Sequence, residues 1–116
     1  GLQSLAHYDL LVTGYCVDCI TDDRDEWRAA MGNVLGVLRP GGTLILDALW
    51  RCRSYRVGSR SFPSADVDVD DLYRCLLDNG FESRSIEIEA HACPEQEACG
   101  YPGILVAFGT KAGRMQ

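Results

Sequence analysis

Apolar and polar positions divide the chain into segments that predict strands and helices in alternation. Residues 8–15 form a short apolar run, which is typical of a buried strand. Apolar side chains recur at helical spacing over residues 24–38, where Asp23 and Glu26 predict an N-cap with a capping box. Residues 43–49 begin as a uniform apolar run, as in a strand covered on both faces. The chain therefore opens as strand, helix, strand.

A Leu-Arg-Pro-Gly-Gly sequence at residues 38–42 separates this helix from the second strand. Proline stops a helix, and the two glycines permit backbone angles that a side chain forbids, so a tight turn is expected here. The strand that follows reaches Asp47 near its end. Ligands of open α/β sheets bind just beyond the carboxyl ends of such strands. Asp47 is therefore predicted to be placed for chemistry.

Residues 50–63 change the character of the chain. They are rich in serine, broken by Gly58 and Pro63, and basic through Arg51, Arg53, Arg56 and Arg60. We interpret them as a long surface loop that includes a short β-hairpin, since loops of this length in compact domains are often lids or binding segments. A solvated basic excursion without function is the alternative.

The remaining segments complete an α/β pattern. A second helix is predicted over residues 69–79, with Asp68 as its N-cap and Gly80 as its C-cap. Apolar and polar residues alternate over residues 83–92, which favours an edge or near-edge strand, and residues 104–108 are a buried last strand. Alternating strands and helices predict a largely parallel sheet that ends in an antiparallel hairpin.

Composition limits the class of protein. With 116 residues, of which 47% are hydrophobic and 24% charged, the chain fits one small globular domain over residues 1–116. A net charge of −6 argues against nucleic acid or an anionic membrane as the main partner. No apolar run approaches the ~20 residues of a membrane helix, and no basic segment precedes an apolar one at the amino terminus. We therefore expect a cytoplasmic protein.

The cysteines admit two interpretations. Because helices and apolar strands account for most of the chain, we expect free thiols in a reducing compartment rather than a disulfide framework. A zinc site is the alternative, built from Cys16, Cys19, His91, Cys93 and Cys99. Zinc modules usually show two compact ligand pairs, and Cys93 and Cys99 are widely spaced. No metal is therefore predicted.

Several short motifs, in order, carry a resemblance to a known family. They are YDLLVTGYCVD at residues 8–18, LRPGG at 38–42, DAL at 47–49, SYRVG at 54–58 and LLDNGF at 76–81. The chain resembles the carboxyl-terminal half of a class I S-adenosylmethionine-dependent methyltransferase, with a Rossmann-like sheet whose last strand is antiparallel. More narrowly, it is similar to the nicotinamide, phenylethanolamine, indolethylamine and thioether methyltransferases. LRPGG alone identifies the superfamily, whereas DAL and the Tyr55-x-x-Gly58 continuation favour the narrower group.

The resemblance implies S-adenosyl-L-methionine as cofactor. Gly14 and Tyr15 match positions where the family's backbone and an aromatic side chain line the cofactor pocket. Cys16 and Ile20 are expected to lie nearby. No residue is assigned as catalytic, because the sulfonium is an activated donor and the rate of methyl transfer comes from in-line positioning.

The same resemblance implies four substrate residues. Asp18 matches an acid that faces the substrate nitrogen in the amine methyltransferases, and Asp47 matches an acid used for substrate recognition in the nicotinamide branch. Tyr55 and Ser64 match lid positions of that branch. Acids around a small pocket suit an amine or pyridine-type nitrogen as the methyl acceptor. The alternatives are a helix-approach cap for Asp18 and an ordinary half-buried aromatic for Tyr55.

The chain also departs from the family. It contains no Gly-x-Gly-x-Gly, so the resemblance implies a partial domain without the amino-terminal glycine-rich cofactor loop. The loop at residues 99–103 has no acid, so the identity of the acceptor does not transfer. Two hypotheses follow: a methyltransferase portion that is incomplete alone, or a non-catalytic α/β binding or interaction module derived from a methyltransferase. The first predicts an exposed sheet edge at residues 8–15, through which a homodimer can form.

Overall fold

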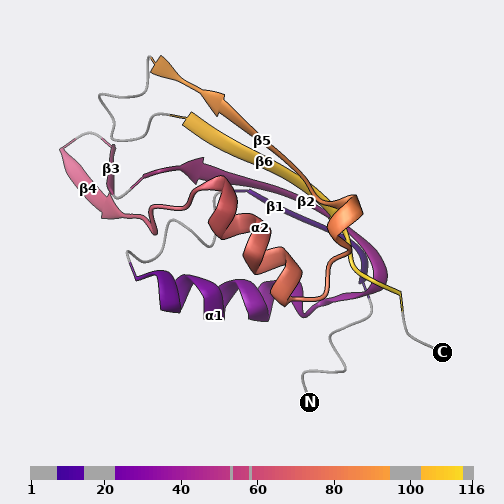
Figure 1. Cartoon of the computed structure of the whole chain (residues 1–116). Helices are drawn as coiled ribbons and strands as arrows, with labels where there is room; N and C mark the ends of the chain where they lie inside the picture. The colour runs from indigo at the N-terminus through magenta and orange to yellow at the C-terminus, as the bar shows by residue number, and fades with distance from the viewer. Residues whose placement is uncertain (1–7, 15–22, 53, 58, 95–102, 114–116) are drawn as a thin grey trace.

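The computed structural model describes residues 8–14, 23–52, 54–57, 59–94 and 103–113. These residues form two helices, one 3₁₀ turn and six strands (Figure 1). Four of the strands make the main sheet, and the other two make a separate hairpin. In chain order the elements are β1 (Tyr8–Gly14), α1 (Arg24–Leu35), β2 (Leu38–Trp50), β3 (Ser54–Val57), β4 (Arg60–Pro63), α2 (Val69–Asp78), η2 (Ser83–Ser85), β5 (Glu87–Ala92) and β6 (Gly103–Thr110).

The main sheet has the strand order β1-β2-β6-β5. β1 pairs in parallel with β2, whereas β6 runs antiparallel to both β2 and β5. β1, β2 and β5 therefore point in one direction and β6 points in the other. This confirms the predicted α/β sheet with an antiparallel last strand, and it confirms the edge position of β5.

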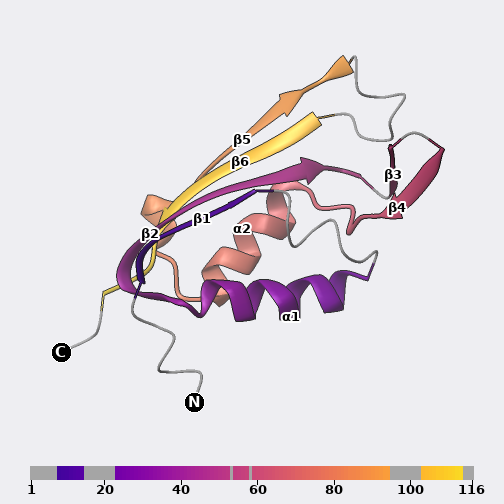
Figure 2. The same cartoon turned by 180° about the vertical axis from the view of Figure 1, so that it is seen from behind.

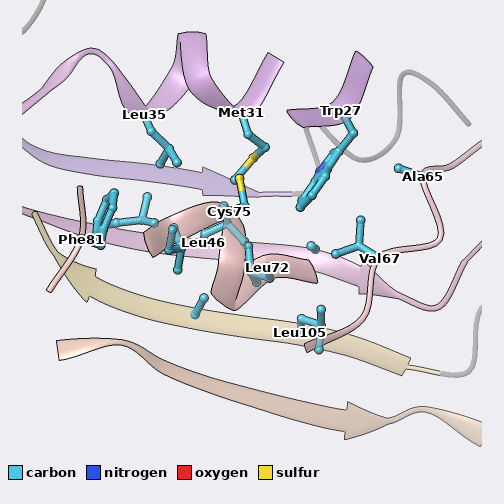
Figure 3. Close-up of a cluster of buried hydrophobic side chains, with 14 of the residues drawn as sticks. Trp27, Met31, Leu35, Leu46, Ala65, Val67, Leu72, Cys75, Phe81 and Leu105 are labelled. Carbon is cyan, nitrogen blue, oxygen red and sulfur yellow. The ribbon is translucent and has the colours of Figure 1, made fainter. Parts of the chain in front are cut away.

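Both helices lie on the same side of the sheet, as the two opposite views agree (Figure 1, Figure 2). The core forms between them and that face of the sheet, where apolar side chains of the helices meet those of β2 and β6 (Figure 3). Its members include Trp27, Met31 and Leu35 from α1, Leu72, Cys75 and Leu76 from α2, Leu44, Leu46 and Ala48 from β2, and Leu105 and Ala107 from β6.

The opposite face of the sheet is not covered by any described element. Because successive side chains of a strand point to opposite faces, the alternate residues of β1 and β2 face away from the helices. Leu10 is 56% exposed and Val12 is 65% exposed. The strand at residues 8–15 is therefore not buried as its apolar run predicts, and the uniform run from residue 43 is not covered on both faces within the described residues.

The end of α1 also differs from the prediction. The helix ends at Leu35 rather than Leu38, because Gly36 follows as the C-cap and its N–H donates to the carbonyl oxygen of Gly32 at 3.0 Å. Leu38, which is fully buried, already belongs to β2. An apolar residue at this spacing fits either a helix stripe or a core-facing strand, so the pattern extends the helix too far.

The Pro-Gly-Gly segment lies inside β2 instead of forming a separate turn. Gly41 has a φ of +86°, which a glycine adopts without the steric cost that a side chain brings. Its N–H donates to the carbonyl of Lys111 at 2.9 Å, and the N–H of Lys111 donates to the carbonyl of Gly42 at 2.9 Å. The glycines thus bend the strand while it stays paired with the end of the chain.

Lys111 ties this region together. Its Nζ donates to the carbonyl oxygen of Leu38 in β2 at 2.7 Å and to that of Leu35 at 3.2 Å. The Leu35 carbonyl lies in the last turn of α1, where carbonyls have no helical partners. Burial lowers the pKa of the Lys111 ammonium.

α2 begins and ends as predicted to within one residue. Asp68 and Asp71 form a capping box at its start, and Gly80, with a φ of +88°, follows its end. The predicted strand at residues 83–92 is shorter, because η2 occupies Ser83–Ser85 and β5 begins at Glu87. The Ser85 hydroxyl donates to the carbonyl of Glu82 at 2.7 Å, which favours this turn over an extended chain.

The described cysteines Cys52, Cys75 and Cys93 carry free thiols, and Cys16, Cys19 and Cys99 lie outside the described residues. Within the described part of the chain, no three His, Cys, Asp or Glu side chains gather in a way that would hold a metal ion. In that same part, neither helix is long and apolar enough to cross a membrane.

The neighbours Leu76 and Leu77 on α2 provide a matched test of the core. Leu76 is 0% exposed and Leu77 is 39% exposed. We expect Leu76→Ala to lower the free energy of unfolding by about 2–5 kcal/mol, because it leaves a cavity between α2 and the sheet. Leu77→Ala, with the same change in helix propensity, should cost less than about 1 kcal/mol. Urea unfolding followed by circular dichroism measures both; equal losses would contradict this placement of α2.

The thiol of Cys75 is expected to be inert in the folded protein. Burial, with a smaller contribution from Asp78, raises its pKa to about 11. A thiol reacts with aromatic disulfide reagents as the thiolate, so Cys75 should not react at pH 8 until the chain unfolds. Replacing it with alanine should leave the number of fast-reacting thiols unchanged. The control Cys93→Ala should lower that number by one, since Cys93 is half-buried in an accessible segment. Rapid labelling of Cys75 in the folded protein would contradict the buried position of this thiol.

Candidate functional site

The carboxyl ends of β1 and β2 meet at one edge of the sheet because the two strands are parallel. Gly14, the last residue of β1, pairs with Asp47 of β2. A Cβ atom on Gly14 would lie 3.9 Å from Oδ2 of Asp47. Two residues that the sequence predicts for cofactor and substrate are thus brought side by side. The Asp47 side chain is half-buried and points to the face of the sheet that the helices do not cover.

Beyond Asp47, β2 leads into a narrow neck from which the β3–β4 hairpin projects (Figure 1). The N–H of Arg51 donates to the carbonyl of Val67 at 2.8 Å, and the N–H of Asp66 donates to the carbonyl of Cys52 at 2.8 Å. These two bonds join the segment that enters the hairpin to the one that leaves it. Arg51 and Asp66 have φ values of +51° and +54°, in the left-handed region. The predicted surface loop is therefore a hairpin on a closed neck.

The neck carries apolar residues that are buried beside exposed Arg51. Cys52, Ala65 and Val67 are buried, and the Ser64 side chain is only 2% exposed. Ser64 thus lies in the interior next to the hairpin. Its predicted contact with a substrate stays a prediction.

Asp68 makes the densest set of polar contacts in this region. Its Oδ1 accepts from Trp50 Nε1 at 2.9 Å and from the N–H of Val69 at 2.7 Å, and its Oδ2 accepts from Arg51 Nε at 3.0 Å. The Arg51 guanidinium also lies 5.1 Å from the centre of the Trp50 ring. The hydrogen bond from Trp50, followed by those from Val69 and Arg51, lowers the pKa of the Asp68 carboxyl.

A second basic residue, Arg24, binds the segment by which the chain leaves the hairpin. Arg24, at the start of α1, donates from Nη2 to the backbone carbonyl of Asp66 at 2.8 Å. Its Nη1 lies 3.5 Å from Oδ1 of Asp71 in α2, and its Nη2 lies 3.7 Å from Oδ2 of Asp66. The beginnings of both helices therefore meet at the neck. Sequence reasoning assigned Asp68 only as a cap and did not assign Arg24 or Trp50 any role.

The other predicted site residues are placed only in part. Tyr55 lies in β3, where it pairs with Phe62 of β4. Tyr15, Cys16, Asp18 and Ile20 lie outside the described residues. The structure thus brings together Gly14 and Asp47, sets Tyr55 and Ser64 in and beside the hairpin, and does not test the remaining four.

The chemistry of this edge follows from Asp47. A carboxylate on the open face of a sheet, next to a glycine that leaves its backbone bare, can bind a cationic nitrogen or accept a proton through water. Bare backbone beside an acid is also the kind of surface that lets a large cofactor approach a strand end.

Curated relatives of the chain are N-methyltransferases. It is 27% identical over 96 residues to the indolethylamine N-methyltransferase of Oryctolagus cuniculus, a match that covers 78% of this chain and 36% of that protein. It is 25% identical over 108 residues to the phenylethanolamine N-methyltransferase of Macaca mulatta, covering 90% and 38%. The nicotinamide N-methyltransferase of Sus scrofa matches at 25% over 88 residues, covering 76% and 33%. The chain thus spans less than two fifths of the length of these relatives.

Solved structures with a similar fold are S-adenosylmethionine-dependent methyltransferases. One from Methanosarcina mazei superposes with a TM-score of 0.71 at 16% identity, covering 94% of this chain and 61% of that chain. The 1,6-didemethyltoxoflavin-N1-methyltransferase of Burkholderia thailandensis, solved with its substrate and S-adenosylhomocysteine, gives 0.60 at 16% identity, covering 92% and 45%. At this identity the likeness shows the fold, which is part of a Rossmann-like methyltransferase sheet.

The family assignment rests on nearly the whole length of the chain. The sequence pattern of the NNMT/PNMT/TEMT family matches residues 3–112, which include the edge formed by Gly14 and Asp47, the hairpin and both helices. The chain belongs to the NNMT/PNMT/TEMT family of methyltransferases.

Proposed function

We propose that this chain takes part in the transfer of a methyl group from S-adenosyl-L-methionine to a small molecule, on an amine or pyridine-type nitrogen. The observation that carries the proposal is the pairing of Gly14 with Asp47 at the carboxyl edge of β1 and β2, in a member of this family. The names of the relatives, which are N-methyltransferases, support nitrogen as the acceptor.

The cofactor supplies an electrophilic methyl group on a sulfonium. Gly14 offers bare backbone at the strand end, and we propose that it borders the cofactor together with Tyr15, Cys16 and Ile20. The chain's own contribution is to place the acceptor in line with the methyl group, because positioning supplies most of the rate in such a transfer.

We propose that Asp47 recognises the acceptor. Its carboxylate binds a protonated amine or receives the proton, through water, that an amine loses before it attacks. A pyridine-type nitrogen already has a free lone pair and needs only placement. Asp18, Tyr55 and Ser64 are proposed as further substrate residues, with Tyr55 on the hairpin and Ser64 beside it.

The chain covers 36% and 38% of its first two relatives, so the activity of a whole methyltransferase is itself part of the proposal. The second candidate function is a non-catalytic interaction module. Such a module predicts a sheet edge capped by polar residues, whereas Leu10 and Val12 of β1 are exposed, so the edge favours the incomplete methyltransferase. Because an apolar edge strand pairs readily with another chain, we also propose a homodimer through β1.

We further propose a cytoplasmic location and no nucleic-acid or membrane partner. The free thiols of the described cysteines suit a reducing compartment. The net charge of −6 disfavours binding to nucleic acid or to anionic lipid.

Calorimetry with S-adenosylhomocysteine tests the cofactor assignment. We expect little or no heat from the chain alone, because it has no glycine-rich loop, and 1:1 binding once the chain is fused to the part of the Oryctolagus relative that the match leaves out. The fusion should also transfer labelled methyl groups to nicotinamide, phenylethanolamine or tryptamine. A fusion that folds, by circular dichroism, yet neither binds nor transfers would contradict the proposal.

Asp47→Asn in the same fusion tests the acceptor site. Loss of a charged hydrogen-bond acceptor should raise the KM for an amine by about 10- to 100-fold. The affinity for S-adenosylhomocysteine should stay within about twofold, since the cofactor carries no contact to this carboxylate in the proposal. Asp25→Asn, which removes the same charge from an exposed position on α1, is the matched control. An unchanged KM for the Asp47 variant would remove this residue from the acceptor site.

Sedimentation of the chain tests the homodimer. A pair of β1 edges should give a dimer at micromolar concentration, and Leu10→Lys should convert it to a monomer, because a lysine on an edge strand opposes pairing. Leu77→Lys, at an exposed apolar position on α2, is the control and should leave the dimer intact. A wild-type chain that sediments as a monomer would refute edge pairing.

A further inference from the structure

We propose that Asp68 is a positioning residue that fixes the β3–β4 hairpin at the carboxyl end of β2, by gripping Trp50 and Arg51 at the neck. We call these three residues the clasp. Its role in substrate enclosure rests on the proposed function, but the hold on the hairpin does not.

The neck controls where the hairpin points. The chain enters through Arg51 and Cys52 and leaves through Asp66 and Val67, and two backbone hydrogen bonds of 2.8 Å join these segments. The hairpin then forms its own two-stranded sheet, separate from the main one. Its direction therefore depends on the backbone angles at the neck more than on pairing with the main sheet.

Those angles are ones that need support. Arg51 and Asp66 both adopt positive φ without being glycine. Such a conformation persists only where surrounding contacts hold it, and it recurs at ligand clamps and active sites. Here each of the two residues is held from a helix start: Arg51 by the Asp68 carboxylate, and Asp66 by Arg24 through its backbone carbonyl.

Asp68 does more than a helix cap requires. One carboxylate oxygen accepting from a backbone N–H is sufficient for capping, and serine does this as well as aspartate. At α1, Asp23 likewise accepts from backbone N–H groups, those of Asp25 and Glu26. At α2, the carboxylate also binds the indole of Trp50 at 2.9 Å and Nε of Arg51 at 3.0 Å, residues that lie 18 and 17 positions away in sequence. Those two bonds link the end of β2, the neck and α2.

The clasp suits a hairpin that must keep a fixed position relative to Asp47. Trp50 is three residues beyond Asp47 on the same strand, so the clasp begins where the candidate site ends. The guanidinium of Arg51 over the Trp50 ring closes the triangle of contacts. Tyr55 follows on β3 and Ser64 follows β4, so both proposed substrate residues are carried by the segment that the clasp holds.

Hydrogen exchange of the unmodified chain, with neither cofactor nor acceptor present, tests the hold directly. Asp68→Ser keeps the cap of α2 and removes the contacts to Trp50 and Arg51. We expect amide exchange in β3 and β4 to become at least about tenfold faster, while exchange in α2 changes by less than about threefold. Trp50→Phe, which keeps a large ring and removes the indole N–H, should also make amide exchange in β3 and β4 faster. Asp23→Ser, the same substitution at the cap of α1, is the matched control and should leave the hairpin unchanged.

The indole N–H of Trp50 gives an independent signature. The chain has two tryptophans, so its ¹H–¹⁵N spectrum contains two indole signals, and Trp50→Phe identifies one of them. Asp68→Ser should shift the Trp50 signal and speed its exchange with solvent, whereas the Trp27 signal should stay in place.

Two results would overturn the proposal. The first is amide exchange in β3 and β4 that is unprotected in the wild type, or that has the same rate in both variants as in the wild type. Either observation would show that the clasp does not hold the hairpin. Equal acceleration of α2 and the hairpin in Asp68→Ser, with no effect of Trp50→Phe, would reduce Asp68 to a helix cap. If Asp68→Ser does not fold, the effect of Trp50→Phe on hairpin exchange, together with the rate at which the wild-type Trp50 indole N–H exchanges with solvent, carries the same decision. Because no ligand is present, a failure here is separate from a failure of the methyl-transfer proposal.

Discussion

The parallel pairing of β1 with β2 is the constraint on which the rest of the structure depends. Parallel strands that are neighbours need a connection long enough to return to the start of the sheet, and α1 lies in that connection. The same pairing puts both carboxyl ends at one edge, so Gly14 and Asp47 become neighbours although they lie far apart in the sequence. The hairpin and both helix starts then gather at that edge. Chemistry is concentrated there because the topology leaves backbone ends and polar side chains in one place.

The one-sided core sets what the chain can do alone. Helices cover one face of the sheet, and among the described residues the other face keeps Leu10 and Val12 open to solvent together with the Asp47 carboxylate. A parallel pair of strands is normally covered on both faces. Here the strands have the apolar composition of a buried sheet, but the described helices cover one face. The family match and the partial coverage of the relatives fit such a half-covered sheet.

The sequence predicted the elements well where one physical signal dominated. Asp68 and Gly80 bounded α2 because a capping side chain and a glycine with positive φ act locally. Asp47 was predicted near the end of a strand, but β2 continues to Trp50, and what ends at Asp47 is the pairing of β2 with β1. Prediction failed where two signals were degenerate: Leu38 fits a helix stripe and a strand equally, and a uniform apolar run does not say whether both faces are covered. The clasp was invisible because its bonds join residues far apart in sequence, and because positive φ at an arginine and an aspartate has no sequence signature.

A crystal structure of the fused chain with S-adenosylhomocysteine and a bound amine would test the central claim most directly. The account predicts the cofactor beside Gly14 and the amine nitrogen within about 2.7–3.2 Å of an Asp47 carboxylate oxygen, or joined to it by one water. A cofactor or amine bound away from this edge, for example at the opposite end of β2 near Gly41 and Lys111, would contradict the assignment of the site.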